Sequence, residues 1–237
     1  MLILAIESSA KPASCAVCSD GALLGQFFQN NGLTHSKTLM PMVESLLINL
    51  DMKITDIEVI AVSRGPGSFT GVRIGVSAVK GLAWGAGIPV CGVSTLEAMA
   101  WQTPEHGTII CPAMDARRGQ VYNALFEWHD GRPVRLCSDR AISLDELADD
   151  LESRAVPCLL VGDGAALCFE RLSAAGIPCR MAPELMRFQT AYGVALAAMH
   201  DKPIPAIELE PSYLRPSQAE QSRIRNSEFG IRNNSGL

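Results

Sequence analysis

Short apolar runs alternate with polar turns along the first hundred residues. Nearly continuous apolar segments at 2–7 and 57–62 are typical of strands buried on both faces. Residues 36–50 instead carry apolar side chains every three or four positions, which predicts an amphipathic helix, and a second helix is expected over 69–85. The predicted strands of this half are 2–7, 14–18, 23–28, 57–62 and 90–93.

The second half repeats this order of elements with weaker patterns. Ser143 and Glu146 form a capping box at the start of a helix over 143–153, and two more helices are expected at 165–175 and 189–200. The predicted strands are 109–115, 121–128, 134–137 and 157–161. The repetition predicts an α/β protein of two related lobes. We expect an N-terminal lobe over 1–104, a C-terminal lobe over 105–215 and a polar tail over 216–237.

A glycine-rich turn, Gly65-Pro66-Gly67, separates strand 57–62 from the helix over 69–85. Backbone N–H groups at such a turn and helix start can bind an anion. The turn lacks the Lys-Ser/Thr pair of a Walker loop, and Thr70 stands where a dinucleotide-binding turn has its third glycine. Two interpretations therefore stay open, a phosphate-binding turn and a purely structural one.

Composition narrows the class of protein. Apolar residues make up 48% of the 237 residues and charged residues 19%, which is typical of a folded globular protein. The net charge of −5 gives no reason to expect tight nucleic-acid binding by this chain alone. We see no signal peptide and no membrane-spanning run, and eight scattered cysteines suit a cytoplasmic protein. Cys15 and Cys18 have the spacing of a redox or zinc pair, but in a strand they point to opposite faces.

Several motifs together resemble one protein family. They are the stretch 63–75 (SRGPGSFTGVRIG) with its continuation 80–83, and the segments 2–9, 35–41, 115–122 and 213–215. In this order they resemble the TsaB family, the accessory subunit of the bacterial machinery that makes threonylcarbamoyladenosine in tRNA. The resemblance covers residues 2 to about 215.

The resemblance implies a fold of the actin, sugar-kinase and Hsp70 type, which is ribonuclease-H-like. In that superfamily an acidic residue on the first strand helps to hold metal and nucleotide, and Glu7 stands at that position. Vestigial phosphate turns would then comprise Glu7, Ser8, Ser9, Gly65 and Gly67. Alternatively, Ser8 and Ser9 only satisfy backbone groups of their turn. We expect no bound cofactor.

Catalytic residues are missing where the resemblance would place them. The related transferase TsaD holds a metal through a His-x-x-x-His pair, and the matching positions here are Thr95 and Met99. His35 at a helix start is interpreted as a capping or packing residue rather than a metal ligand. Asp115 is expected to pair with Arg117 or Arg118 rather than act as a base. We therefore expect a non-catalytic scaffold, with a small-molecule phosphotransferase or a metallopeptidase as the alternatives.

The helices at 36–50 and 69–85 are the predicted partner surface. The resemblance implies that they bind a TsaD-type transferase, or a second copy of the chain when TsaD is absent, in a system that includes a TsaE-type ATPase and reaches tRNA only through the complex. Small residues within the second helix would let a facing helix approach closely; alternatively, Gly71 and Gly75 let it pack on its own sheet. The predicted interface residues are Met40, Val43, Leu47, Gly71, Gly75, Ala78, Val79 and Leu82.

Overall fold

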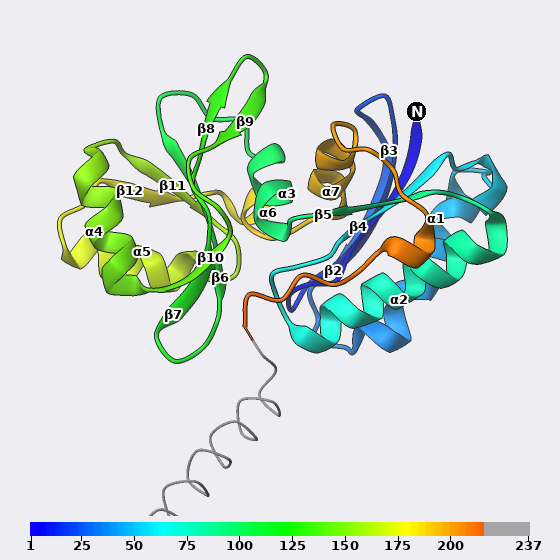
Figure 1. Cartoon of the computed structure of the whole chain (residues 1–237), viewed down its shortest axis with the longest axis horizontal. Helices are drawn as coiled ribbons and strands as arrows, with labels where there is room; N and C mark the ends of the chain where they lie inside the picture. Colours follow the sequence, from blue (N-terminus) through cyan, green and yellow to red (C-terminus); the bar gives the residue numbers. More distant parts are fainter. Residues whose placement is uncertain (216–237) are drawn as a thin grey trace, which may run out of the picture.

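Two β-sheets, each flanked by helices, form two lobes that lie side by side (Figure 1). The computed structural model describes residues 1–215. The first sheet has the strand order β3-β2-β1-β4-β5, and the path through the second is β10-β7-β6-β11-β12. Strands that correspond in chain order occupy corresponding places, apart from the inserted β8–β9 hairpin. The predicted duplication of the α/β lobe is therefore present in the topology.

The first sheet combines an antiparallel meander with two parallel strands. Its strands are β1 (Leu2–Glu7), β2 (Ala13–Ser19), β3 (Ala22–Gln29), β4 (Val59–Ser63) and β5 (Val90–Val93). Strands β1 and β4 pair in parallel, with Leu4 opposite Ile60, and both are buried on both faces. This double burial explains the continuous apolar runs in their sequences.

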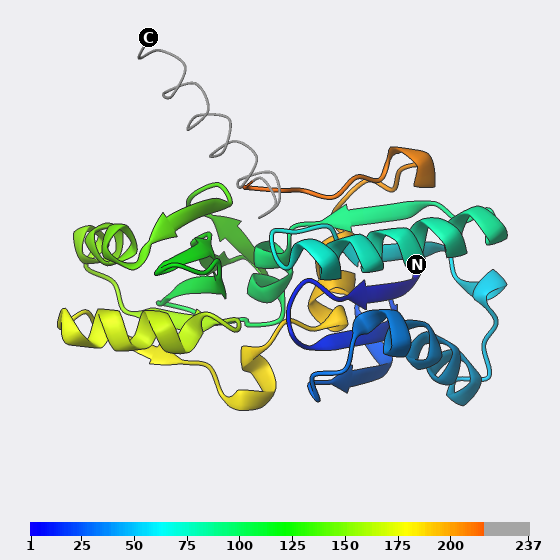
Figure 2. The same cartoon turned by 90° about the horizontal axis from the view of Figure 1, so that it is seen from below.

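Helices cover both faces of this sheet. On one face lie α1 (His35–Asn49) and α2 (Phe69–Ala86), side by side (Figures 1 and 2). On the other face lie α3 (Thr95–Trp101) and α7 (Ala191–Ala198). Helix α2 is followed by Gly87, which has the left-handed backbone conformation that commonly ends a helix (φ 70°).

The second sheet carries shorter strands and its own pair of helices. Its strands are β6 (Ile109–Asp115), β7 (Gln120–Asn123), β8 (Phe126–His129), β9 (Arg132–Arg135), β10 (Arg140–Ser143), β11 (Cys158–Val161) and β12 (Cys179–Met181). Its remaining helical segments are α4 (Leu144–Arg154), α5 (Ala165–Ala174) and the short α6 (Glu184–Arg187). The capping box of Ser143 and Glu146 at the start of α4 is confirmed.

One predicted strand is divided in the structure. Residues 121–128 form two strands, β7 and β8, and Asn123 at the end of β7 is fully buried. Its Nδ2 donates to the carbonyl oxygen of Pro112 at 2.9 Å, and its Oδ1 accepts two hydrogen bonds from Arg140. Buried polar groups need such partners. Both pieces still pair with β6 in one register, Asn123 opposite Ala113 and Phe126 opposite Ile110.

Helix α3 belongs to the cores of both lobes. Its Ala98 and Trp101 pack in the first lobe with α7, whereas Leu96 and Met99 pack against the second sheet. Between the lobes, Arg135 on β9 donates to Glu97 of α3 at 2.9 Å. Because six of its seven residues are buried, some against each lobe, α3 fixes one lobe against the other.

The end of the described chain returns to the first lobe, which corrects the boundary predicted from the sequence. Helix α7 packs on the first sheet, although the predicted second lobe ran over 105–215. Beyond it, residues 203–215, which we name the strap, run along α2 and include the 3₁₀ turn η2 (Ala206–Glu208). Ile204 bridges to Val90, and Lys80 of α2 donates to the carbonyl oxygen of Leu209 at 3.0 Å. The predicted tail, 216–237, lies outside the described residues.

Candidate functional site between the lobes

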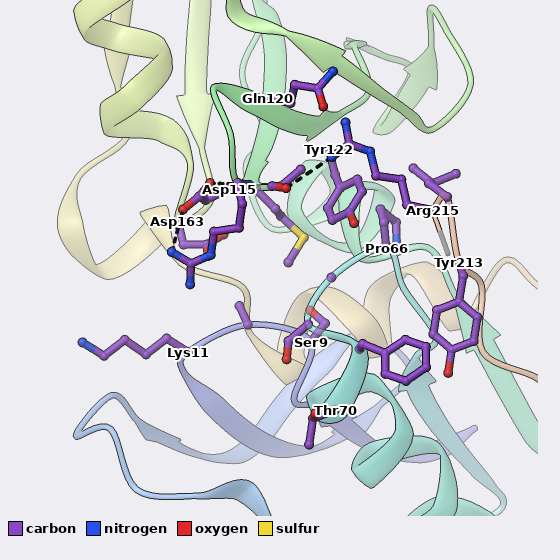
Figure 3. A pocket seen from close by; sticks show the side chains of 18 of the residues that line it. Ser9, Lys11, Pro66, Thr70, Asp115, Gln120, Tyr122, Asp163, Tyr213 and Arg215 are labelled. Carbon is purple, nitrogen blue, oxygen red and sulfur yellow. Dashed lines mark hydrogen bonds and ion pairs between the residues drawn. The ribbon is translucent and has the colours of Figure 1, made fainter. Parts of the chain in front are cut away.

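A cleft with a volume of 960 Å³ lies between the two lobes. The first lobe contributes the turn after β1 and the start of α2, and the second contributes the turn after β6 and Asp163 after β11. The end of the strap closes one side with Tyr213 and Arg215 (Figure 3). The cleft therefore lies at the carboxyl ends of the parallel strands of both lobes, β1 and β4 in the first and β6 and β11 in the second.

Glu7 ends β1, two residues before the cleft-lining Ser9, and is completely buried. Burial raises the pKa of its carboxyl, although Ser9, whose N–H donates to Oε1 at 2.5 Å, lowers it. The other carboxyl oxygen has no hydrogen-bond partner within residues 1–215. A carboxyl with a raised pKa and no exposure favours the neutral acid, which is a poor metal ligand.

The glycine turn has a structural reason for its glycines. A side chain at Gly65, where φ is 117°, would collide with the backbone of Ser212, and one at Gly67 would collide with the backbone of Ser9. The N–H of Ser68 donates to the carbonyl oxygen of Ser9 at 2.6 Å. Of the predicted phosphate-turn residues, only Ser9 and Gly67 line the cleft. These contacts favour the structural interpretation of the turn.

Asp115 and Asp163 are the carboxylates that line the cleft. As predicted, Asp115 pairs with Arg117, 3.2 Å from Nη1, and it also accepts the N–H of Arg117. Burial raises the pKa of Asp163, although a hydrogen bond from Gln189 at 2.9 Å lowers it. Sequence reasoning missed Asp163 as a site residue; its only signal was the Gly-Asp-Gly turn after a buried strand.

Thr95 and Met99 occupy one side of α3 and are both fully buried. Met99 packs in the core with Leu96, and the N–H of Thr95 donates to the carbonyl oxygen of Gly65 at 3.0 Å. Nowhere in the described part of the chain do three His, Cys, Asp or Glu side chains come together as metal ligands. Nε2–H of His35 donates to the carbonyl oxygen of Ala10 at 2.8 Å, which agrees with the predicted packing role at the start of α1.

Cys15 and Cys18 lie on opposite faces of β2, as predicted. Cys15 belongs to the core under α1 and α2, and Cys18 to the core under α7. Burial raises the pKa of Cys15 to about 12 and that of Cys18 to about 11. Such thiols stay protonated and unreactive at neutral pH.

The predicted partner surface needs a correction. Val43, Leu47, Gly71, Gly75 and Val79 are buried inside the first lobe, so they cannot contact a partner as they stand. A side chain at Gly71 would collide with the carbonyl oxygen of Ser8, and one at Gly75 with the hydroxyl of Ser8. The alternative interpretation therefore holds for these two glycines: they let α2 pack on its own sheet.

Other residues of the same two helices do face outward. Met40 is 40% exposed, and Ala78 and Leu82 are partly buried. Two large apolar residues that sequence reasoning did not select are more exposed still, Ile48 on α1 at 69% and Trp84 on α2 at 77%. Ile48 follows Met40 by eight residues, which in a helix places the two on the same broad side, about two turns apart.

The duplicated lobes and the cleft between them define a protein of the actin, sugar-kinase and Hsp70 fold class. The family model described as "TsaD: tRNA N6-adenosine threonylcarbamoyltransferase" matches residues 31–156. The tRNA threonylcarbamoyladenosine biosynthesis protein TsaB of Bacillus subtilis is 36% identical over 167 residues, which cover 70% of this chain and 73% of that protein. The chain belongs to the TsaB family.

Two further relatives match over nearly their full length. The TsaB of Haemophilus influenzae is 29% identical over 234 residues, covering 91% of this chain and 94% of that protein. The crystal structure of an uncharacterized Pseudomonas aeruginosa protein with similarity to peptidase YEAZ superposes with a TM-score of 0.77 at 27% identity. That comparison covers 90% of this chain and 99% of the other, so the two-lobed fold is shared throughout.

Proposed function

We propose that this chain is a non-catalytic scaffold subunit in tRNA threonylcarbamoyladenosine biosynthesis. In this proposal it binds a TsaD-type transferase and acts with a TsaE-type ATPase. It is required for threonylcarbamoyl transfer to the adenosine next to the anticodon. The observation that carries the proposal is the outer side of α1 and α2, where Met40, Ile48 and Trp84 expose large apolar side chains. An exposed apolar surface of this kind is typical of a protein–protein contact.

The inner sides of α1 and α2 support the proposal that their outer sides bind a partner. Leu39, Val43 and Leu46 of α1 and Val72 and Val79 of α2 already fill the core of the first lobe. The exposed residues are therefore not needed to hold the helices in place. We propose the same surface for self-association of the chain when the transferase is absent.

The cleft offers little support for the phosphotransferase alternative. Glu7 is buried with a raised pKa, and both oxygens of Asp115 are engaged by Arg117. A base or metal ligand needs a carboxylate that is ionised and accessible. If the isolated chain hydrolysed ATP and Glu7→Ala or Asp115→Ala abolished this activity, the phosphotransferase would replace the scaffold proposal.

The residues of α3 at the positions of the expected metal ligands disfavour the metallopeptidase alternative. The side chains at the two positions of the expected ligand pair are a threonine and a core methionine. None of the helices in residues 1–215 has the length and apolar content to cross a membrane.

The test is a pair of charge substitutions on the exposed side of the helices. Met40→Glu and Trp84→Glu should weaken self-association in sedimentation and co-purification with the TsaD-type subunit together. tRNA modification by the reconstituted system should fall in parallel. Leu185→Glu is the matched control, because Leu185 is 94% exposed on α6 of the other lobe. Unchanged co-purification of a folded Trp84→Glu variant would place the interface elsewhere.

A further inference from the structure

The lining of the cleft is positively charged although the whole chain has a net charge of −5. Among residues 1–215, four cationic residues line it, Lys11, Arg117, Arg118 and Arg215, against the two carboxylates Asp115 and Asp163. Arg117 pairs with Asp115, whereas Lys11 and Arg118 have no ion-pair partner among residues 1–215. The cleft therefore attracts anions.

Aromatic side chains gather at the same place. Phe69, Tyr122 and Tyr213 line the cleft, and two of them are among the only three tyrosines of the chain. The rings of Phe69 and Tyr213 lie 4.8 Å apart between centroids. The guanidinium of Arg73 lies 3.7 Å from the centroid of Phe69, and its Nε donates to the hydroxyl of Tyr213 at 2.8 Å. Tyr213 is nevertheless 40% exposed, so part of its ring is accessible.

The start of α2 adds hydrogen-bond donors to this surface. The hydroxyl of Ser68 accepts the N–H of Gly71 at 3.2 Å, which leaves the N–H groups of Phe69 and Thr70 without an acceptor inside the helix. Phe69 and Thr70 both line the cleft, as do Lys11 of the first lobe and Arg118 of the second. Free N–H groups at a helix start suit a phosphate oxygen.

We propose that the mouth of the cleft binds an RNA segment directly, with phosphates at Lys11 and Arg118 and a base against Tyr213. Cations combined with exposed aromatic rings are the usual means of binding unpaired nucleotides, since each nucleotide offers a phosphate and a flat base. An acidic peptide would use the cations but not the rings. The inference rests on the proposed function and refines it, because RNA then contacts this chain itself and not only its partners.

The experiment uses the isolated full chain and a fluorescent tRNA anticodon stem–loop, with binding measured by anisotropy at several salt concentrations. Each lost phosphate contact lowers the slope of log K against log salt by about 0.7 to 0.9. Lys11→Gln and Arg118→Gln should each show this decrease. Arg132→Gln, an exposed arginine on the β8–β9 hairpin, is the matched control and should leave the slope unchanged.

The stacking contact is tested separately at one salt concentration. Tyr213→Leu should weaken RNA binding by about tenfold without changing the salt slope, and Tyr213→Phe, which keeps the ring, should bind as the unaltered chain does. Equal effects of Arg118→Gln and Arg132→Gln would overturn the proposal, as would the absence of binding at low salt. Binding of ATP that depends on Lys11 and Arg118, with RNA binding independent of them, would also overturn it in favour of a free nucleotide.

The outcome is distinguishable from a failure of the scaffold proposal. No measurement here uses the TsaD-type subunit, and Trp84 lies at the far end of α2 from the cleft. Trp84→Glu should therefore leave RNA binding by the isolated chain intact even where it disrupts the complex.

Discussion

Gly71 and Gly75 occupy places where even a methyl group has no room. The hydroxyl of Ser8 donates to the carbonyl oxygen of Gly71 at 2.9 Å, so the turn after β1 lies directly on α2. A Cβ at Gly71 would meet backbone, which cannot move aside, whereas one at Gly75 would meet the Ser8 hydroxyl. The two glycines thus join the helix to the turn that borders the cleft.

Gly71→Ala should lower the free energy of unfolding by about 1–3 kcal/mol, with a smaller loss for Gly75→Ala. Gly81→Ala is the control in the same helix, because a Cβ there meets nothing within 4 Å. It should raise stability by up to about 1 kcal/mol, since alanine is the better helix former. Urea unfolding of the three variants measures these changes in the free energy of unfolding. If Gly71→Ala left this free energy unchanged, the close packing at Gly71 would be refuted.

Glu7 should make the stability of the chain depend on pH. Its folded pKa is raised above the ordinary value of 4.5, so the folded state binds the proton more tightly than the unfolded state. The associated stability is fully present below pH 4.5 and is lost as the pH rises through the folded pKa. Glu7→Gln stays neutral at every pH and keeps an oxygen for the N–H of Ser9. Its free energy of unfolding relative to the unaltered chain should therefore be more favourable at pH 8 than at pH 4. Equal effects at both pH values in urea unfolding would contradict an ionisation at Glu7.

At the scale of elements, α2 is held from three sides. Its inner side packs on the first sheet, its start borders the cleft, and the strap runs along it. Lys80 donates to the carbonyl oxygens of Ile207 at 3.3 Å and Leu209 at 3.0 Å, while the N–H of Ser212 donates to the carbonyl oxygen of Arg64 at 2.7 Å. The outward side remains uncovered within the described chain, which leaves it to the proposed partner.

Lys80→Met should loosen the strap without unfolding the lobe. Loss of two hydrogen bonds from a charged donor should raise amide exchange at Leu209 and Ser212 by about tenfold or more. Lys37→Met, an exposed lysine of α1, is the control and should leave the strap unchanged. Hydrogen exchange read by mass spectrometry checks this, and unchanged exchange in Lys80→Met would mean that the strap is held elsewhere.

At the scale of the whole molecule, the two lobes share α3. Leu96 and Met99 face the second sheet, and Ala98 and Trp101 face the first, so neither core is complete without this helix. The hydroxyl of Ser94 at its start donates to Asp139 at 2.6 Å, and Gln102 at its end donates to the carbonyl oxygen of Phe188 at 2.7 Å. The lobes are therefore expected to unfold together.

Met99→Ala should cost about 2–5 kcal/mol and reduce exchange protection in both β4 and β11. Leu151→Ala is the comparison, because Leu151 of α4 is also buried in the second lobe but does not lie on the helix that the two lobes share. That variant should reduce protection in β11 first. If Met99→Ala affected only the second lobe, α3 would not couple the two cores.

The sequence by itself determined the elements whose pattern is local. The continuous apolar runs of β1 and β4, the opposite orientation of Cys15 and Cys18, and the cap of α4 depend on neighbouring residues alone. The motifs spread along the chain were enough to predict the family to which it belongs. They were not enough to predict the boundaries of the lobes. The sheet that a helix covers depends on residues that are far away in the sequence.

Only the tertiary structure decided which positions are inside. The apolar pattern of α7 is nearly the same all round the helix, so it could not show that α7 returns to the first sheet. From the sequence, Gly71 and Gly75 could serve close packing against either a partner helix or the chain's own backbone. The structure places Ser8 against both glycines, which decides for the second interpretation. The cleft unites Lys11, Asp163 and Tyr213, which are brought together across more than a hundred residues. A pattern of neighbouring residues cannot encode such a meeting, because its geometry is set by the packing of two complete lobes on α3.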